Sequence, residues 1–309
     1  MALDPVDLSG RKILITGPSG QVAEPVVAAL APESEVVALA RFSKDEDRER
    51  IEGLGARCIS ADLADAHGLD DVPRDFDYVL NFAVVKTGNF DYDLAANGEG
   101  VGRLMTHCRD VKAFLHFSST AVYEYAGHEP RAEDSPLGDN HRVMFPTYSI
   151  SKIAAETVCR FVAHQYQIPT TIARLSVPYG DNGGWPFFHL LMMKEGIPID
   201  VHPESPNYYN PLHVEDYLEK IPRLLAAATP EVTTVNFGGS ERVSIEEWCA
   251  YLQELTGFEP VFNENPKAFG SLCIDTTRMH ELIGPTSVDW RTGIRRLVES
   301  LAPDLLKDS

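Results

Sequence analysis

Short runs of apolar residues alternate with longer segments of helical periodicity over the first 175 residues of the chain. Such a run predicts a strand that is covered on both faces, and the amphipathic segments between the runs predict helices. The expected strands are residues 13–15, 35–40, 57–60, 78–83, 113–117 and 170–175, and the expected helices are residues 21–31, 44–54, 92–109 and 148–167. Strands that alternate with helices predict an α/β fold with a doubly wound parallel sheet.

The pattern becomes less regular after residue 176, where proline and glycine are frequent. Helical periodicity returns at residues 214–228 and 245–256, and residues 233–237 resemble a short strand. We therefore expect residues 1–175 to form the sheet domain. Residues 176–309 are expected to form a smaller C-terminal α/β lobe, interleaved with that domain, which binds the substrate over the carboxyl edge of the sheet.

A glycine-rich turn joins the first strand to the first helix. Glycine lets the backbone turn sharply and approach a pyrophosphate, while the helix N-terminus offers free N–H groups and partial positive charge. The motif therefore predicts a Rossmann-type dinucleotide-binding domain over residues 1–175. A purely structural turn is the alternative. The expected cofactor contacts in this turn are Gly17, Ser19, Gly20, Gln21 and Val22.

The tip of the second strand predicts which cofactor is bound. An acid there would favour NAD, but this strand ends in Leu39-Ala40-Arg41. Because a guanidinium can bind a 2′-phosphate, NADP(H) is favoured and NAD(H) is the alternative. Arg41 could instead stack on adenine or face solvent. Asp62, with Leu63 beside it, is expected to meet the adenine amino group, and a helix cap is the alternative role of this aspartate.

A tyrosine and a lysine four residues apart begin the helix after the fifth strand. This spacing places Tyr148 and Lys152 on one helix face. A phenol with its ordinary pKa near 10 is a poor base, but a neighbouring ammonium favours the phenolate. A serine in the run 118–119 could hold the substrate oxygen while the proton moves. The set suits proton transfer on a hydroxyl or carbonyl during hydride transfer with nicotinamide; a surface helical pair is the alternative.

These ordered motifs resemble those of the extended short-chain dehydrogenases/reductases, also called the NAD-dependent epimerase/dehydratase family. The resemblance covers nearly the whole chain and includes the segments LNFAVV (80–85), RLSVPYG (174–180), HVEDY (213–217) and NFGGSERVSIEEW (236–248). It implies an enzyme in which Tyr148 is the general acid/base, Lys152 tunes its pKa and binds the ribose, and Ser119 is the catalytic serine. It further implies that Asn97 orders the site, that Ala83 and Val177 contact the cofactor, and that the chain forms a homodimer.

The same resemblance exposes departures that bear on the substrate. Nucleotide-sugar members usually carry an asparagine where this chain has Val177 and an arginine where it has Tyr209. Both usual residues bind the substrate diphosphate, so the sequence predicts a substrate that is not a nucleotide sugar. Sugar dehydratases carry Asp-Glu after the catalytic hydroxyl, whereas this chain has Thr120-Ala121. Dehydration is therefore not expected.

A partly apolar substrate pocket is expected from the remaining polar and aromatic candidates. Its predicted substrate contacts are Lys86, Ser119, Tyr123, Trp185 and Tyr209. Lys86 could meet a carboxylate. Packing within the lobe is the alternative for each residue. The leading prediction is an NAD(P)-dependent oxidoreductase that acts on a small hydroxyl or carbonyl compound. The alternatives are a nucleotide-sugar 4-epimerase with retained NAD and a non-catalytic dinucleotide-binding regulator.

Composition narrows the partners and the compartment. Lys and Arg number 27 against 46 Asp and Glu, a net charge of −19, which disfavours nucleic acid and anionic membranes. No segment is long and apolar enough to suggest a membrane span. The five cysteines are scattered and odd in number, which predicts a reducing cytoplasm. The histidines lack paired ligand spacing, so no metal is expected.

Overall fold

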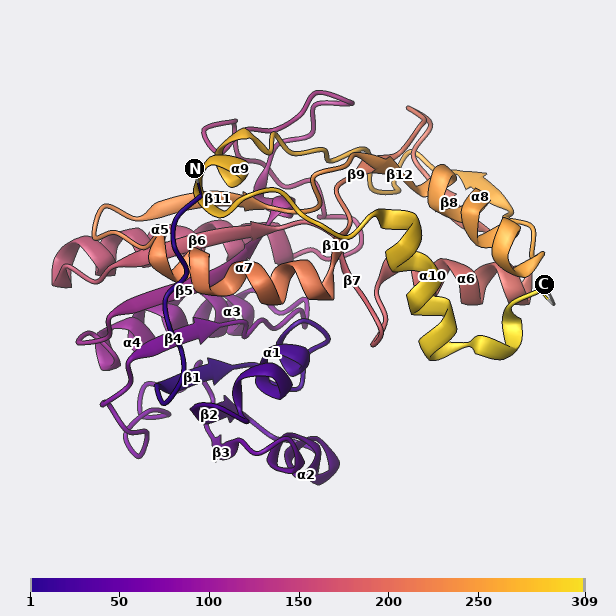
Figure 1. Cartoon of the computed structure of the whole chain (residues 1–309). Coiled ribbons are helices and arrows are strands. Elements are labelled where there is room, and N and C mark those ends of the chain that lie inside the picture. The colour runs from indigo at the N-terminus through magenta and orange to yellow at the C-terminus, as the bar shows by residue number, and fades with distance from the viewer. Residues whose placement is uncertain (1, 308–309) are drawn as a thin grey trace.

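A seven-stranded parallel sheet forms the centre of the computed structural model, which describes residues 2–307 (Figure 1). All neighbouring strands of this sheet run parallel. Across the sheet the strands are β11 (Thr233–Phe237), β6 (Thr170–Leu175), β5 (Ala113–Ser119), β4 (Tyr78–Asn81), β1 (Lys12–Thr16), β2 (Glu35–Ala40) and β3 (Arg57–Ser60). The predicted doubly wound α/β fold is confirmed.

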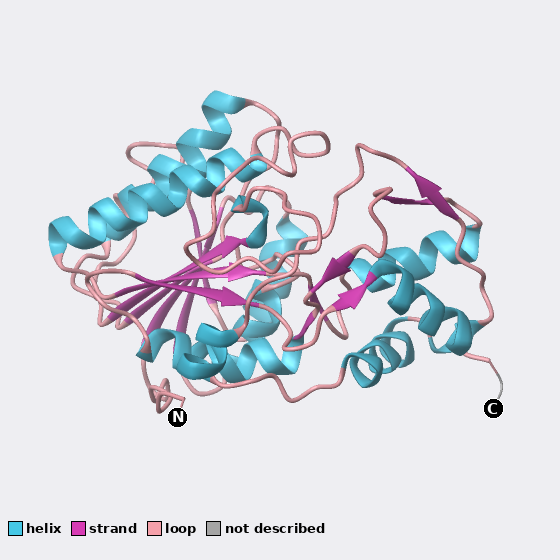
Figure 2. Ribbon diagram, turned by 90° about the horizontal axis from the view of Figure 1, so that it is seen from above, coloured by secondary structure: helices cyan, strands magenta, loops and turns pink. Residues whose placement is uncertain are grey.

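Helices cover both faces of this sheet, as Figure 2 shows. Because side chains alternate along a strand, Val36 and Ala38 of β2 enter one core and Val37 and Leu39 enter the other. The first core is closed by α1 (Ala23–Leu30), α2 (Asp45–Gly53), α7 (Val214–Ala226) and α9 (Thr277–Ile283). The second core is closed by α4 (Gly100–His107) and α5 (Tyr148–Tyr166).

The strand order reverses between β1 and β4. From β1 the chain proceeds outward through β2 and β3, and from β4 it proceeds in the opposite direction through β5 and β6. The connections that leave β1 and β4 therefore diverge to opposite sides of the sheet. Such a switch point opens a crevice at the carboxyl ends of the two strands. This topology fixes where a ligand can lie.

A smaller lobe continues from the carboxyl edge of the sheet and has its own apolar core around Trp248 and Leu252 (Figure 1). Its helices are α6 (Trp185–Glu195), α8 (Ile245–Thr256) and α10 (Trp290–Leu301). Its short strand pairs are β7 (Pro178–Tyr179) with β10 (Leu212–His213), β9 (Tyr208–Tyr209) with β12 (Val243–Ser244), and β8 (Ile199–Val201) with β13 (Phe262–Glu264). Between these pieces the chain returns to the main sheet for α7 and β11, so residues after 176 contribute to both bodies.

The predicted helix over residues 92–109 is divided in the structure. It comprises α3 (Phe90–Leu94), a π-helical turn at Ala95–Glu99 and α4. The predicted strand over residues 78–83 ends at Asn81, because Phe82 and Ala83 leave the sheet and line the crevice. In both places the local sequence pattern is continuous while the backbone deviates next to the cavity. A π-helical turn of this kind often marks a functional site.

Candidate active site

The glycine turn after β1 brings two segments of backbone into close contact. Gly17 has φ +64°, and a Cβ at this position would lie 3.0 Å from the Cα of Ala83. The Gly17 N–H donates to the carbonyl of Leu39, and the Gly20 N–H donates to the carbonyl of Gly17. These contacts leave a narrow cradle of backbone in front of α1. The cradle fits the pyrophosphate of a dinucleotide, which requires close backbone approach near a helix N-terminus.

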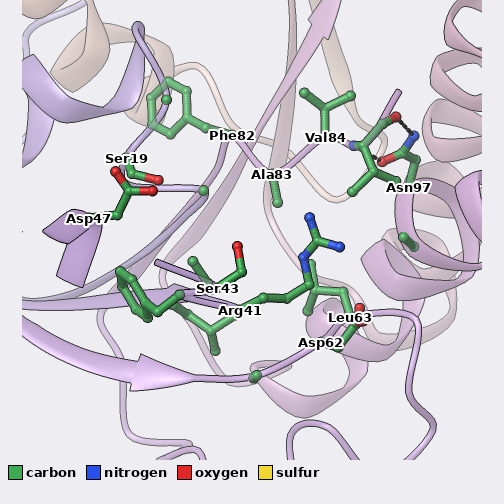
Figure 3. Close-up of a pocket in the computed structure, with 18 residues that line it drawn as sticks. Ser19, Arg41, Ser43, Asp47, Asp62, Leu63, Phe82, Ala83, Val84 and Asn97 are labelled. Atoms are coloured by element: carbon green, nitrogen blue, oxygen red, sulfur yellow. Dashed lines mark hydrogen bonds between the residues drawn. The ribbon is translucent and has the colours of Figure 1, made fainter. Parts of the chain in front are cut away.

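A cleft of about 340 Å³ continues from this cradle across the ends of β1, β2 and β4 (Figure 3). Ser19 and Asp47 lie on one side of it, and Arg41, Asp62 and Leu63 lie on the other. Of the predicted cofactor contacts, this cleft brings together Gly17, Ser19, Gly20, Arg41, Asp62, Leu63 and Ala83. The neighbouring cavity contains Gln21, Val22, Tyr148, Lys152 and Val177.

Ala83 is held at the floor of the cleft by buried polar groups. Its N–H donates to the Thr16 hydroxyl across 3.1 Å, and that hydroxyl donates to the Asn81 side-chain oxygen across 2.6 Å. The Asn81 amide in turn lies 2.9 Å from Nδ1 of His116. Burial lowers the pKa of His116 well below its ordinary value, so this network is neutral at pH 7. The cleft floor is therefore fixed across β1, β4 and β5.

Arg41 is already engaged by the protein. Its guanidinium donates to the Tyr92 hydroxyl across 2.7 Å, and that hydroxyl donates to Asp62 across 2.9 Å. The other Asp62 oxygen accepts from the N–H of Ala64, as in a turn. Asp47 adds a second carboxylate to the same cleft. One guanidinium nitrogen of Arg41 is thus bound to Tyr92, and a 2′-phosphate would meet the carboxylates of Asp47 and Asp62 in the same cleft, so its environment there would be mixed in charge.

The Tyr148 and Lys152 side chains lie in the cavity next to this cleft, on the first turns of α5. The Lys152 ammonium is 4% exposed and donates to the carbonyl of Phe117 across 2.7 Å. Burial lowers its pKa to about 8, with the nearby Glu156 carboxylate acting in the opposite direction. Burial raises the pKa of Tyr148, and the Ser119 hydroxyl only partly offsets that rise. In the chain alone the phenol is therefore protonated at neutral pH.

A buried ion pair supports the catalytic helix from behind. Glu156, one turn after Lys152, accepts from Ser118 across 2.6 Å and from two guanidinium nitrogens of Arg174 across 2.9 and 2.8 Å. This bidentate contact joins α5 to β6, while Ser118 joins α5 to β5. Ser119, the next residue, caps a short turn by accepting from the Ala121 N–H. The network fixes the height of α5 over the strand that carries Ser119.

Asn97 lies in the π-helical turn and contacts two parts of the site. Its amide nitrogen donates to the carbonyl of Val85 and to the Ser151 hydroxyl, and its oxygen accepts from the Val85 N–H. The Ser151 hydroxyl donates to the carbonyl of Tyr148. Asn97 therefore connects the loop after β4 to the first turn of α5.

Asp93 makes a second connection between the same two segments. This fully covered carboxylate accepts from the backbone of Thr87 and Gly88, from the Thr87 hydroxyl and from the Thr147 hydroxyl. Burial opposes its ionisation, but these hydrogen bonds outweigh burial and lower its pKa. Thr147 directly precedes Tyr148 and Thr87 directly follows Lys86. The sequence analysis did not identify Asp93, because its partners lie in irregular loops.

The second cavity, of about 480 Å³, is open toward the small lobe. It contains four of the predicted substrate contacts, namely Lys86, Ser119, Trp185 and Tyr209. The Tyr209 hydroxyl is used within the lobe, where it donates to the carbonyl of Gly270. Tyr123 is fully buried outside the cavity and donates to Asn236, so the structure does not place it at the substrate.

Three ring side chains at this cavity were missed from the sequence. His141 stacks on Phe269, with centroids 4.1 Å apart, and Phe145 packs edge-on against Tyr148. Burial lowers the pKa of His141 to about 4, and the charge of Lys86 adds to the effect. All three residues come from segments without periodicity, and no local signal identifies them. Phe269 also stacks on Trp185 at the start of α6, so part of the cavity wall is aromatic.

Charge at the cavity is opposite to charge on the chain. The described residues that line it include two lysines, Lys86 and Lys152, and no aspartate or glutamate. The chain as a whole has 46 acidic residues against 27 basic ones. Among residues 2–307, no group of three or more histidine, cysteine or acidic side chains is arranged to hold a metal ion. No helix within the same range is long and apolar enough to span a bilayer.

The chain belongs to the NAD dependent epimerase/dehydratase family, whose model matches residues 13–238. The resemblance to the extended short-chain dehydrogenases/reductases is thereby confirmed. The family assignment covers the glycine turn, Tyr148 and Lys152 in one continuous match.

Three proteins illustrate the range of similarity. The low-salt glycan biosynthesis protein Agl12 of Haloferax volcanii is 25% identical over 54% of this chain and 57% of its own length, so the match spans little more than half of that relative. The dTDP-D-glucose 4,6-dehydratase of Bos taurus is 22% identical over 96% of this chain and 90% of its own. The UDP-glucuronic acid 4-epimerase of Bacillus cereus, solved with UDP-glucuronic acid and NAD, has a TM-score of 0.79 at 20% identity and covers 94% of this chain and 98% of its own.

These comparisons bear on two expectations made from the sequence. The prediction that the substrate is not a nucleotide sugar is wrong, because the Bos taurus relative is a dTDP-D-glucose 4,6-dehydratase and two structural neighbours were solved with UDP-glucuronic acid and with UDP-glucose. The error came from treating Val177 and Tyr209 as lost contacts, although a diphosphate can be held by other groups. The predicted preference for NADP is likewise not supported, since the neighbours contain NAD.

Proposed function

We propose that this protein is a nucleotide-sugar 4-epimerase that keeps NAD bound. Bound NAD would accept a hydride from the sugar and return it to the opposite face. The observation that carries the proposal is the junction of the two cavities, which share Gly17, Gly20, Phe82 and Val84. A dinucleotide bound in the first cavity would therefore end at the cavity that holds Tyr148. The sugar would therefore react between the cofactor and α5.

Proton transfer in this proposal belongs to Tyr148. The Ser119 hydroxyl lies beside the phenol and would hold the sugar oxygen while the proton moves. Because burial raises the pKa of Tyr148, the proton leaves readily only when positive charge gathers nearby. Lys152 and the oxidised cofactor would supply that charge and hold Tyr148 as a phenolate, which would take the proton of the C4 hydroxyl as the hydride leaves C4. The same phenol returns the proton when the ketone is reduced.

Among its described residues the cavity has no carboxylic acid, and this absence favours epimerisation over dehydration. Elimination of water needs an acid and a base at the neighbouring carbons, and carboxylic acids usually serve. No aspartate or glutamate lines this cavity, and Thr120-Ala121 follow Ser119. The site therefore offers one acid/base group, which suffices for oxidation and reduction at a single carbon.

NAD is proposed as the cofactor in preference to NADP. The Arg41 guanidinium is held by Tyr92, and Asp47 faces the same cleft. Neutral ribose hydroxyls suit this mixed environment better than a phosphate. The residues proposed to hold NAD are those brought together by the cleft and the glycine turn. The predicted homodimer, the cytoplasmic location and the division at residue 175 stay predictions.

The proposal is tested on the protein as purified. Denatured protein is expected to release about one NAD per chain, and a panel of UDP- and dTDP-hexoses is expected to show inversion at carbon 4 by proton NMR. Tyr148→Phe should retain NAD and lose about 10²- to 10⁴-fold in turnover. Tyr166→Phe, on the same helix and 40% exposed, is the matched control. Protein free of NAD that reduces simple ketones with NADPH would overturn the proposal.

A further inference from the structure

The Lys86 ammonium occupies an unusual position beside the catalytic tyrosine. Its nitrogen lies 5.4 Å from the centroid of the Tyr148 ring and 4.7 Å from that of Phe145. The residue is accessible because it lines an open cavity, yet enough protein surrounds the ammonium to lower its pKa. Burial is the only cause of that change, and no carboxylate among the described residues raises the pKa again. Among the described residues, Lys86 is therefore a cation that has no carboxylate partner.

The fold holds this cation in place. Asp93 accepts hydrogen bonds from Thr87 and Gly88, immediately after Lys86, and from Thr147, immediately before Tyr148. Asn97 fixes Val85, immediately before Lys86, through two hydrogen bonds. Both neighbours of Lys86 in the chain are thus anchored. The backbone that carries Lys86 is therefore held by hydrogen bonds against the start of α5.

The surroundings of Lys86 also suit an anionic ligand. None of the residues 2–307 that line the cavity is acidic, although the chain is strongly acidic overall. The neutral imidazole of His141 lies in the same wall and can take part in hydrogen bonds. An ammonium group that lies beside aromatic rings and has no carboxylate partner is stabilised most by a ligand that carries a negative charge.

The chemistry at Tyr148 limits which part of the substrate can meet this cation. In a 4-epimerase the reacting carbon C4 lies at the phenol. The diphosphate is attached to C1, across the sugar ring, whereas C3 and C5 are the direct neighbours of C4, and C5 carries C6. A cation against the Tyr148 ring is therefore closer to a group at C6 than to the diphosphate. A C6 carboxylate would match both the place and the charge.

We propose that Lys86 is a specificity-determining residue that binds the C6 carboxylate of a nucleotide-linked uronic acid. This inference rests on the proposed function and adds the substrate class. It assigns the acidic sugar, and not its neutral hexose counterpart, as the preferred substrate.

The test compares two sugars that differ only at C6, namely UDP-glucuronic acid and UDP-glucose. Binding to the NAD-loaded protein is measured by calorimetry and turnover by NMR. Wild-type protein should bind the uronate about ten- to a hundredfold more tightly than the hexose. Lys86→Met should remove most of that ratio, and Lys86→Arg should restore part of it. Lys194→Met, an exposed lysine on α6 outside the cavity, is the matched control.

The remaining outcomes separate this inference from the proposed function. Equal binding of both sugars, with a ratio that Lys86→Met leaves unchanged, overturns the inference while epimerisation of either sugar sustains the function. Loss of NAD from Lys86→Met would mean that this lysine holds the cofactor, and an equal fall in kcat for both sugars would mean that it acts on Tyr148. Either result overturns the inference. Tight, Lys86-dependent uronate binding without inversion at C4 would instead uphold the carboxylate site and overturn the epimerase.

Discussion

The Thr147 hydroxyl donates a hydrogen bond to the Asp93 carboxylate, with the two oxygens 2.6 Å apart. Because Thr147 directly precedes Tyr148 in the chain, this contact ties the start of the catalytic helix to α3, which carries Asp93. The same carboxylate holds the loop that carries Lys86. One buried acid therefore fixes the distance between the proposed acid/base and the proposed anion site.

Asp93→Asn should loosen this arrangement and destabilise the protein. In the variant, one carboxylate oxygen that now accepts hydrogen bonds is replaced by an amide NH₂, which would face N–H and O–H donors. We therefore expect the free energy of unfolding at pH 7 to fall by about 2–3 kcal/mol. The folded pKa of Asp93 lies below the ordinary value, so its stabilising effect is present at neutral pH and is lost as the pH falls below about 4. Urea unfolding at pH 7 and pH 3.5 should show the difference between wild type and variant shrinking. A constant difference would contradict the role of the charge.

Gly17→Ala should impair cofactor binding. The substitution places a Cβ 3.0 Å from the Cα of Ala83 at a backbone φ of +64°, so both the turn and the cleft floor must shift. We expect NAD content to fall at least tenfold and thermal stability to decrease. Gly53→Ala, at a glycine with nothing within 4 Å of the added carbon, is the control that should keep NAD. Full NAD occupancy in Gly17→Ala would show that the cradle tolerates a side chain.

His141 should make stability sensitive to moderately acidic pH. Its folded pKa is about 4, so between pH 6.5 and 4 the unfolded chain takes up a proton that the folded chain does not. Wild-type stability should therefore fall over this window by up to about 3 kcal/mol more than that of His141→Gln. Chemical unfolding of both proteins at pH 7 and pH 4.5 gives the comparison. Parallel pH dependence would mean that the imidazole is protonated in the folded protein.

Val177→Asn should raise the stability of the protein and strengthen its binding of a nucleotide sugar. Val177 has φ +29°, a region that β-branched residues avoid and asparagine tolerates. Relief of this strain is expected to add about 1 kcal/mol of stability. The new amide would also face the cavity and offer a donor to a diphosphate, so KM for a nucleotide sugar should fall. A less stable variant, or a higher KM, would argue that the apolar side chain is needed there.

The regular elements of this fold could be predicted from the sequence. Residues 170–175, 233–237 and 245–256 match β6, β11 and α8 to the residue, because each has a clear local pattern. The assignment of residues 233–237 to the main sheet could not be predicted, since the partner of an edge strand is set by tertiary packing.

The site residues that belong to a sequence motif could be predicted, whereas those that come together from separate loops could not. Gly17, Tyr148 and Lys152 have fixed spacing within single elements, and the structure places them around one pair of connected cavities. His141 and Phe269 are far apart in the chain and meet only through stacking. Asp93 and Thr147 are 54 residues apart. Tyr123 follows the serine run but turns into the core, which no local pattern distinguishes.

The place of β11 at the edge of the central sheet also determines the order in which the protein can be completed during translation. β6 leaves the ribosome before residues 176–232, which build much of the small lobe, and its partner β11 follows only after them. Throughout that interval the nascent chain carries an unpaired parallel edge, and α9, which follows β11 in the chain, has not yet closed the core beside it. Ribosome stalling within this stretch should therefore yield chains that depend on chaperones, whereas chains released after α9 can bury the whole sheet.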